Sequence, residues 1–184
     1  MKTQRGFTLL ELLVTIAILG VVSAMTFPAF SSWIAKRRLS ADFEALQALT
    51  QQLQMQAQGQ AGTAALVCSG NRITAQVSKI NAAGSCPVPA TVFSSVNVIA
   101  DLTEGLPNWK QVKVTHCDGR RLVFHADGSV CGENGMPTVI QLSYLNDPGM
   151  SKNGGFELAL SQATGFAQRH RLDPGVGKSW QSMD

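Results

Sequence analysis

The sequence has little net charge and no internal repeat. Its 184 residues carry a formal charge of +3, and loss of Lys2 and Arg5 with a cleaved N-terminal segment would leave only +1. A chain that is not broadly basic cannot bind an anionic polymer over its whole surface, so such binding would require a local cluster of cations. The length suits one globular domain together with a membrane helix.

The sequence also lacks the motifs of an active site. No serine–histidine–aspartate arrangement and no pair of carboxylates stands out, so we expect no enzyme activity and no cofactor. Residues 175–179 resemble the end of a phosphate-binding loop, but the position of that motif's first glycine holds Leu172. Too little chain follows for the helix that must continue such a loop.

Zinc-ligand residue types are present, but their usual spacing is missing. His116, Cys117, His125 and Cys131 carry nitrogen and sulfur atoms that can bind zinc. These four residues match neither a C-x-x-C nor an H-x-x-x-H pattern. We therefore predict no metal site and expect the histidines to lie on the surface or in strands.

What the sequence does contain is a long apolar segment near its N-terminus with a single charge in it. From Phe7 to Phe27 about 21 residues would form about 32 Å of helix, which is enough to cross a bilayer. Glu11 lies near the start of this segment. A charged side chain at the bilayer centre costs about 2.5–3.5 kcal/mol on insertion scales. Glu11 therefore needs a compensating partner and is a candidate functional residue.

This segment resembles the N-terminus of type IV pilins, a family that includes minor pilins and type II secretion pseudopilins. Residues 6–13 (Gly-Phe-Thr-Leu-Leu-Glu-Leu-Leu) carry the resemblance, and Pro28 matches the family's helix-bending proline. The resemblance implies that a prepilin peptidase cleaves between Gly6 and Phe7 and methylates the new amine of Phe7. It also implies that Glu11 pairs with the Phe7 amine of a neighbouring subunit, which would compensate the buried charge.

Two other interpretations of the segment are weaker. Ser23-Ala24-Met25 imitates the cleavage site of a secretory signal, and a plain membrane anchor could carry Glu11 incidentally. Lys2 and Arg5 favour a cytoplasmic N-terminus, but the basic residues 36–38 on the other side leave the orientation open. The pilin resemblance implies a single pass through the inner membrane with a periplasmic domain, followed by assembly into a pilus or pseudopilus. Residues 36–38 would meet lipid headgroups, acidic groups of a neighbouring subunit, or solvent.

A helical pattern continues beyond the apolar segment. Large apolar residues recur every three or four positions, and glutamines occupy much of the opposite side. Pro28 lacks an N–H and should kink the helix near its exit from the membrane. We predict a membrane-spanning, filament-core helix over 7–28 and an amphipathic continuation over 29–58. The apolar stripe of that continuation consists of Leu39, Phe43, Leu46, Leu49 and Leu53.

From residue 59 onward, short β-rich runs alternate with glycine, serine and asparagine. Asp118-Gly119 and Asp127-Gly128 are hairpin turn signals. We predict an α+β, pilin-like fold in which the long helix packs on an antiparallel sheet built from residues 59–184, with a flexible basic C-terminal tail. The predicted strands are 65–68, 72–77, 92–99, 111–115, 121–124, 138–144 and 156–160.

Features of this domain resemble FimT/GspH-type minor pilins and pseudopilins. They are Val67-Cys68 after the helix, a hairpin over 121–128, and a late strand that leads to Gly165, whereas the segment from Cys86 to Trp109 departs from the pattern. The resemblance implies a subunit that helps to initiate or cap a filament. Its partners would be other pilins and an inner-membrane assembly platform driven by an ATPase. A type II secretion pseudopilin that contacts secretion partners is an alternative.

Four cysteines lie in the part that would face the periplasm. Because that compartment is oxidising, we expect Cys68, Cys86, Cys117 and Cys131 to form disulfides, for which three pairings exist. We favour Cys68–Cys86 and Cys117–Cys131, because these pairs close the shortest loops. The second pair fits less well if residues 112–131 form a meander, since its cysteines would then lie on non-adjacent strands.

The last candidate site is a basic cluster near the C-terminus. Arg169 and Arg171 flank His170, Lys178 follows, and the nearest acid is Asp173. Guanidinium groups bind phosphate oxygens, and such contacts are independent of base sequence. Some FimT-type minor pilins bind DNA during natural transformation through a C-terminal G-R-x-R motif. Only the R-x-R part is present here, so binding of double-stranded DNA is an alternative to a solvated or partner-binding tail.

Overall fold

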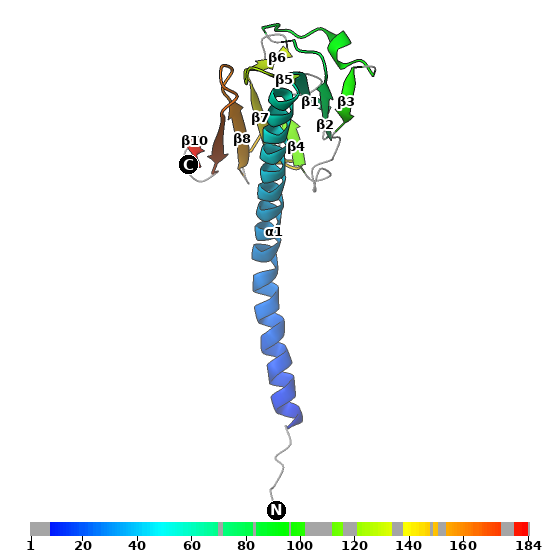
Figure 1. Ribbon diagram of the computed structural model, residues 1–184. Coiled ribbons are helices and arrows are strands. Elements are labelled where there is room, and N and C mark those ends of the chain that lie inside the picture. The colour runs from blue at the N-terminus through cyan, green and yellow to red at the C-terminus, as the bar shows by residue number, and fades with distance from the viewer. Residues whose placement is uncertain are drawn as a thin grey trace, which may run out of the picture. The chain divides into compact units, whose positions relative to one another are not determined.

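The chain divides into two compact units, Met1–Arg37 and Arg38–Asp184, and each is described by itself. Helix α1, Leu9–Gly59, contributes to both units (Figure 1). The computed structural model describes residues 8–69, 72–82, 84–95, 97–101, 112–115, 121–133, 138–147, 149–150, 154–173 and 179–183.

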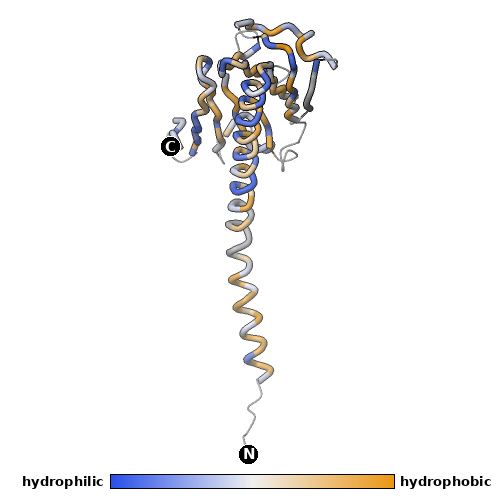
Figure 2. The backbone as a smooth tube through the Cα atoms, in the orientation of Figure 1, coloured by the Kyte–Doolittle hydropathy of each residue, from blue (hydrophilic) through white to orange (hydrophobic). Residues whose placement is uncertain are grey.

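The first unit contains the apolar part of α1. Apolar residues follow one another along it, as the hydropathy colouring of Figure 2 shows. Their side chains are exposed on every side of the helix, from 77% for Leu9 to 50% for Leu13. Within the described part of the chain, no helical segment combines the length and the apolar character that a bilayer crossing requires. Pro28 lies inside α1, and its side chain falls outside the described residues.

In the second unit, α1 buries the stripe of side chains that its sequence pattern predicts. Leu39, Phe43, Leu46 and Leu53 are at most 2% exposed, and Leu49 is partly buried against the same core. The helix ends at Gly59, and the backbone then turns at Ala61, whose φ is 48°. The apolar stripe that the sequence pattern indicates is therefore the buried face of α1.

The strands form two antiparallel five-stranded sheets, where we predicted one. Their orders are β3-β2-β1-β5-β6 and β10-β9-β8-β7-β4. The first sheet contains β1 (Thr63–Ser69), β2 (Arg72–Ser78), β3 (Val98–Asp101), β5 (Arg121–His125) and β6 (Val130–Gly132). The second contains β4 (Val112–Thr115), β7 (Val139–Tyr144), β8 (Gly155–Leu160), β9 (Ala167–Leu172) and β10 (Trp180–Ser182).

One predicted strand was wrong, because residues 92–99 are not one strand: the short helix η1, Ala90–Phe93, precedes β3. The meander that we considered for residues 112–131 does not form either, because β4 pairs with β7 in the second sheet while β5 pairs with β6 in the first. Val92 and Phe93 are buried, and the Val92 carbonyl accepts a hydrogen bond from Ser78 at 2.6 Å. Their apolar character thus reflects packing over a sheet, not pairing within it.

The main core joins α1 to both sheets. Phe43 of α1 stacks on Phe156 of β8 with ring centroids 4.9 Å apart. Leu66 of the first sheet and Leu142 of the second are fully buried in the same cluster as Leu46. Since each such side chain contributes about 2–5 kcal/mol relative to alanine, this cluster is the main source of stability for the second unit.

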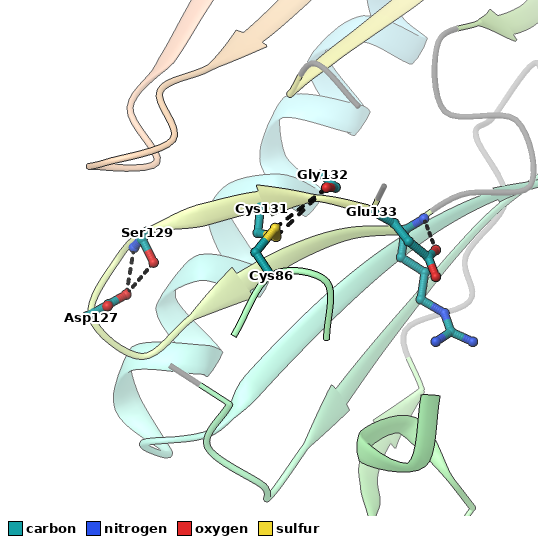
Figure 3. Close-up of a disulfide and its surroundings, with 7 residues drawn as sticks. Cys86, Asp127, Ser129, Cys131, Gly132 and Glu133 are labelled. Atoms are coloured by element: carbon teal, nitrogen blue, oxygen red, sulfur yellow. Dashed lines mark hydrogen bonds between the residues drawn. A yellow bond between two sulfur atoms is a disulfide. The ribbon is translucent and has the colours of Figure 1, made fainter. Parts of the chain in front are cut away.

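The first sheet is also covered on its other face by the segment that follows β2. Val88, Val92 and Phe93 pack there in a second cluster with Val123 of β5 and Cys131 of β6. A disulfide between Cys86 and Cys131, whose Cα atoms are 6.1 Å apart, joins this segment to β6 (Figure 3).

The disulfide overturns both cysteine pairs that we favoured. Cys86 pairs with neither Cys68 nor a near neighbour in sequence, but with Cys131, 45 residues away. The reason is topological: the chain after β2 returns across the sheet and meets β6, so closeness in space does not follow loop length. The side chain of Cys68 and all of Cys117 lie outside the described residues.

Candidate functional site

The first candidate site is the start of α1. Thr8 precedes the first helical residue, and its Oγ1 accepts a hydrogen bond from the backbone N–H of Glu11 at 3.2 Å. Thr8 and Glu11 have the spacing of a capping box, in which the N-cap hydroxyl satisfies the N–H of the third helical residue. Sequence reasoning missed this signal. The cap places the Glu11 carboxylate in the first turn, where the helix dipole favours a negative charge.

The surroundings of Glu11 are apolar and exposed. Leu10 and Leu12 are 73% and 58% exposed, and Glu11 is the one charged residue between positions 8 and 24. Two hydroxyls in this stretch are already satisfied, because Thr15 donates to the Leu12 carbonyl at 2.8 Å and Ser23 to the Leu19 carbonyl at 2.7 Å. Glu11 takes part in neither the His170–Glu157 nor the Arg171–Asp173 ion pair.

Comparisons with known proteins match this same end of the chain. Residues 1–27 match the family model of the prokaryotic N-terminal methylation motif. A fimbrial protein of Moraxella nonliquefaciens is 44% identical over 43 residues, which cover 23% of this chain and 28% of that protein. The type IV major fimbrial protein FimA of Dichelobacter nodosus is 43% identical over 37 residues, which cover 20% of this chain and 23% of that protein.

The N-terminal segment of the chain is therefore similar to that of type IV pilins. The matched segment leads into the helix that carries Glu11. The chain spans about a quarter of the length of the curated relatives it matches. No solved structure shows a significant match to it. Gly6 and Phe7, between which we predict the cleavage, lie outside the described residues, as does the side chain of Pro28.

The second candidate site is the basic cluster, and most of it is not in a flexible tail. Arg169, His170 and Arg171 lie in β9, which pairs with β8 on one side and β10 on the other. Figure 1 shows β10 at the outer end of its sheet, next to the C-terminus. The prediction of a flexible tail is therefore wrong for these two strands. Lys178 lies outside the described residues.

Strand geometry separates the arginines from the histidine. Alternate residues of a strand point to opposite faces, so Arg169 and Arg171 share one face and His170 lies on the other. The cross-strand neighbours of the two arginines are the buried Leu158 and Phe156. The guanidinium of Arg171 also forms an ion pair with Asp173 at 2.9 Å, which offsets half the charge of the R-x-R pair.

His170 belongs to a polar row across the opposite face of the second sheet. Its Nδ1 lies 3.2 Å from a carboxylate oxygen of Glu157 in β8. The other oxygen of Glu157 accepts a hydrogen bond from the amide of Gln141 in β7 at 2.7 Å. His170 therefore has a structural partner, and we do not place it with the arginines in a phosphate-binding group.

Arg169 lines a groove between α1 and the turn that joins β8 to β9. The groove has a volume of about 740 Å³, and polar side chains of α1 line one side of it. Gln54 of α1 donates a hydrogen bond to the Thr164 carbonyl at 3.1 Å and fixes the turn against the helix. The remaining lining residues of the groove are Gln47, Thr50, Gln51, Leu160, Gly165, Phe166 and Ala167.

Gly165 shapes this turn. Its φ is +65°, and a Cβ at this position would lie 2.7 Å from the Gly128 carbonyl oxygen and would also meet the Gln54 side chain. Both observations require glycine, because side chains rarely adopt a positive φ and cannot approach a backbone oxygen so closely. The glycine that ends the predicted late strand is therefore a structural element of the groove.

A smaller pocket of about 350 Å³ lies beside the disulfide, with His125 in its lining. His125 is 2% exposed, and its Nδ1 has no hydrogen-bond partner among the described residues. Burial lowers the pKa of His125, and the negative charge of Asp127 opposes that shift. Two hydrogen bonds from Ser129 lower the pKa of Asp127 in turn, at the hairpin turn shown in Figure 3.

The disulfide beside this pocket excludes one of the four zinc ligands that we considered from the sequence. Cys131 is bonded to Cys86, so its sulfur is not a thiolate and cannot serve as a zinc ligand. His116 and Cys117 lie outside the described residues. The Asp127-Gly128 turn, with Gly128 at φ +87°, confirms the hairpin predicted there, whereas Asp118-Gly119 falls outside the described residues.

Proposed function

We propose that this chain is a minor pilin or pseudopilin, a subunit that acts in the initiation or at the tip of a type IV pilus or a related filament. The observation that carries the proposal is the single carboxylate of Glu11 on an otherwise apolar, exposed helix surface. An exposed apolar helix requires cover by lipid or by other helices, and a carboxylate under that cover requires a cation.

The cation that we propose is the Phe7 amine of a neighbouring subunit. Cleavage after Gly6 would create a new amine at Phe7, four residues before Glu11 in the same chain. A neighbouring subunit, shifted along the filament axis, would present its Phe7 amine to this carboxylate. Because removal of one partner leaves a buried charge uncompensated, the pair would select a correctly placed neighbour.

The proposed function also places the chain in the inner membrane before assembly. The apolar half of α1 would hold the chain in the inner membrane before assembly, with its N-terminus cytoplasmic and the second unit periplasmic. There it would meet the prepilin peptidase, the assembly platform and other pilins. The Cys86–Cys131 disulfide supports a periplasmic domain, since disulfides persist in oxidising compartments.

The minor-pilin part of the proposal is supported by details of the second unit. The hairpin of β5 and β6 and the glycine turn after β8 correspond to the features by which the sequence resembles FimT/GspH-type subunits. In this assignment the second unit presents binding surfaces and performs no chemistry.

The test is a pair of glutamate variants of α1. Glu11→Ala should leave a protein that is cleaved and retained in the membrane but is lost from sheared filaments, because its apolar surface is intact while the cation of the neighbour has no partner. Glu44→Ala, which removes an exposed carboxylate from the second half of α1, is the matched control and should assemble normally. Immunoblots of membrane and sheared fractions provide the measurement. Normal incorporation of Glu11→Ala would reject the proposed role of Glu11.

A second candidate function is DNA binding during uptake, and one observation favours it. Arg169 and Arg171 are alternate residues of β9, so their Cα atoms are about 7 Å apart on one face. The strand therefore presents two neighbouring positive charges on that face. Lys178 would add a third positive charge. Against this, Asp173 pairs with Arg171 and would repel phosphate.

Because the two arginines would attract DNA phosphate and Asp173 would repel it, substitutions of these residues test the DNA-binding candidate. The affinity of the full chain in detergent for a labelled DNA duplex should fall steeply with salt. Arg169→Ala/Arg171→Ala should abolish binding, and Asp173→Asn should strengthen it. Lys79→Ala/Lys113→Ala, with the same loss of two charges elsewhere in the second unit, should bind as the parent does. Absence of binding at low salt would reject this candidate and leave the filament role.

A further inference from the structure

The apolar half of α1 ends in a ladder of rings and a cation. Phe30 and Trp33 stack with centroids 5.9 Å apart, and the guanidinium of Arg37 lies 5.3 Å from the centroid of the Trp33 ring. Residues spaced by three and four positions share a helix face, so the three side chains form one continuous surface. Phe30 is 61% exposed and Trp33 is 52% exposed. This surface is not part of the second unit's core.

The ladder lies at a defined distance along the helix. From Leu9 to Trp33 the helix advances about 36 Å, because each residue adds about 1.5 Å. A bilayer has an apolar core of about 30 Å and measures about 40–45 Å with its headgroups. A helix whose first turn lies at one edge of the apolar core therefore places Trp33 among the headgroups on the opposite side. Tryptophan is enriched at that depth, because one part of its ring system is apolar and its N–H is polar.

The basic residues after Trp33 also favour a position among lipid headgroups. Lys36, Arg37 and Arg38 begin three residues after Trp33, and the nearest acids in sequence are Glu11 and Asp42. Lys36 and Arg37 are exposed. With Arg37 stacked on the indole ring, an aromatic surface and a cation are presented side by side. That combination complements an anionic phospholipid, whose acyl chains would contact the rings while its phosphate meets the cations.

We propose that Phe30, Trp33, Lys36 and Arg37 form an interfacial anchor that binds anionic phospholipid headgroups where α1 leaves the membrane. The inference rests on the membrane anchoring in the proposed function and adds the lipid class and the residues. The anchor sets the depth of the unassembled subunit and must release its lipids when the subunit enters a filament. Each basic residue near an anionic surface strengthens such an association by about fivefold.

The experiment uses the full chain reconstituted in phosphatidylcholine vesicles. Trp109→Phe/Trp180→Phe leaves Trp33 as the single tryptophan of the three. A minority lipid with bromine near the headgroup end of its acyl chains is then added, either as phosphatidylglycerol or as phosphatidylcholine in the same amount. We expect brominated phosphatidylglycerol to quench Trp33 fluorescence several-fold more strongly, and both lipids to quench more strongly than versions brominated near the chain ends.

Variants and a second readout separate this inference from the one on which it rests. Lys36→Gln/Arg37→Gln should reduce the phosphatidylglycerol-to-phosphatidylcholine quenching ratio toward one, while Lys79→Gln/Lys113→Gln should leave it unchanged. An alkaline carbonate wash reports anchoring independently. A chain that resists the wash but shows a ratio of one, or no quenching, would overturn the interfacial anchor and leave membrane insertion standing. A chain that washes off would overturn both.

Discussion

The two halves of α1 contain the same kinds of residue in opposite states. In the first unit Leu9, Leu13 and Leu19 are at least half exposed, whereas in the second Leu46 and Leu53 are fully buried. The second half packs against two sheets of its own chain, and these sheets bury its leucines. The first half has no such partner within the described residues. The comparison teaches that one half of the helix stabilises this fold, while the other half is suited to an intermolecular surface.

The largest expected effect comes from a matched pair of leucine substitutions. Leu46→Ala removes a fully buried side chain from the core and should lower the free energy of unfolding by about 2–5 kcal/mol. Leu12→Ala, at a site 58% exposed, should change it by less than about 0.5 kcal/mol but should weaken filament incorporation. Thermal unfolding in detergent measures the first effect. Equal losses of stability for the two variants would contradict the division of roles between the halves.

The disulfide should have the next largest effect, and it should act on the second unit alone. Cys86→Ser/Cys131→Ser frees the segment that covers the first sheet and should lower the free energy of unfolding by about 2–4 kcal/mol. Denaturant unfolding gives the value. Peptide mapping without reduction provides the check on the pairing, and recovery of a Cys68–Cys86 peptide would refute the pairing described above.

A smaller effect is expected at the groove. Gly165→Ala must place a Cβ at a φ of +65° beside the Gly128 carbonyl, and should destabilise the second unit by about 1–3 kcal/mol. Gly59→Ala is the control, since a Cβ there meets nothing within 4 Å and its φ is not positive. That variant should be neutral or slightly stabilising. A neutral Gly165→Ala would show that the turn after β8 does not require glycine.

The smallest effect is a pH dependence, again confined to the second unit. Burial lowers the pKa of His125 in the folded state below its ordinary value of 6.5, so the unfolded chain binds more protons in the interval between the two values. Stability should therefore be complete above about pH 6.5 and should fall as the pH drops through that interval. The nearby charge of Asp127 makes the fall shallower. Denaturant unfolding at several pH values should show a slope that His125→Asn removes, and an unchanged slope would assign it to other groups.

Local patterns predicted the parts of the chain whose structure depends on near neighbours. The leucine stripe predicted which face of α1 is buried, since helical spacing puts those residues together whatever they pack against. Asp127-Gly128 predicted a hairpin because a tight turn is specified by its own residues. The strands predicted over 138–144 and 156–160 from their β-rich residues form at 139–144 and 155–160 for the same reason.

The basic strand shows where such reasoning fails. Residues 167–172 contain one large apolar residue, Leu172, and no alternating pattern, so their sequence indicates a loop. They form β9 because β8 and β10 supply backbone partners and because Glu157 pairs with His170 across the strands. These contacts join residues between seven and seventeen positions apart, and composition does not reveal them. The same limit explains why the groove beside Arg169 was not predicted.

The sequence by itself determined the leader motif, the apolar helix with its single carboxylate and the amphipathic stripe that follows, because each depends on spacing along one chain. Only the tertiary structure decided that the sheet is two sheets, that Cys86 meets Cys131, and that Arg169 and Arg171 share a strand face with Asp173 bound to one of them. Those outcomes depend on which distant segments become neighbours when the core closes. That choice is made by the packing of the whole domain and not by any local pattern.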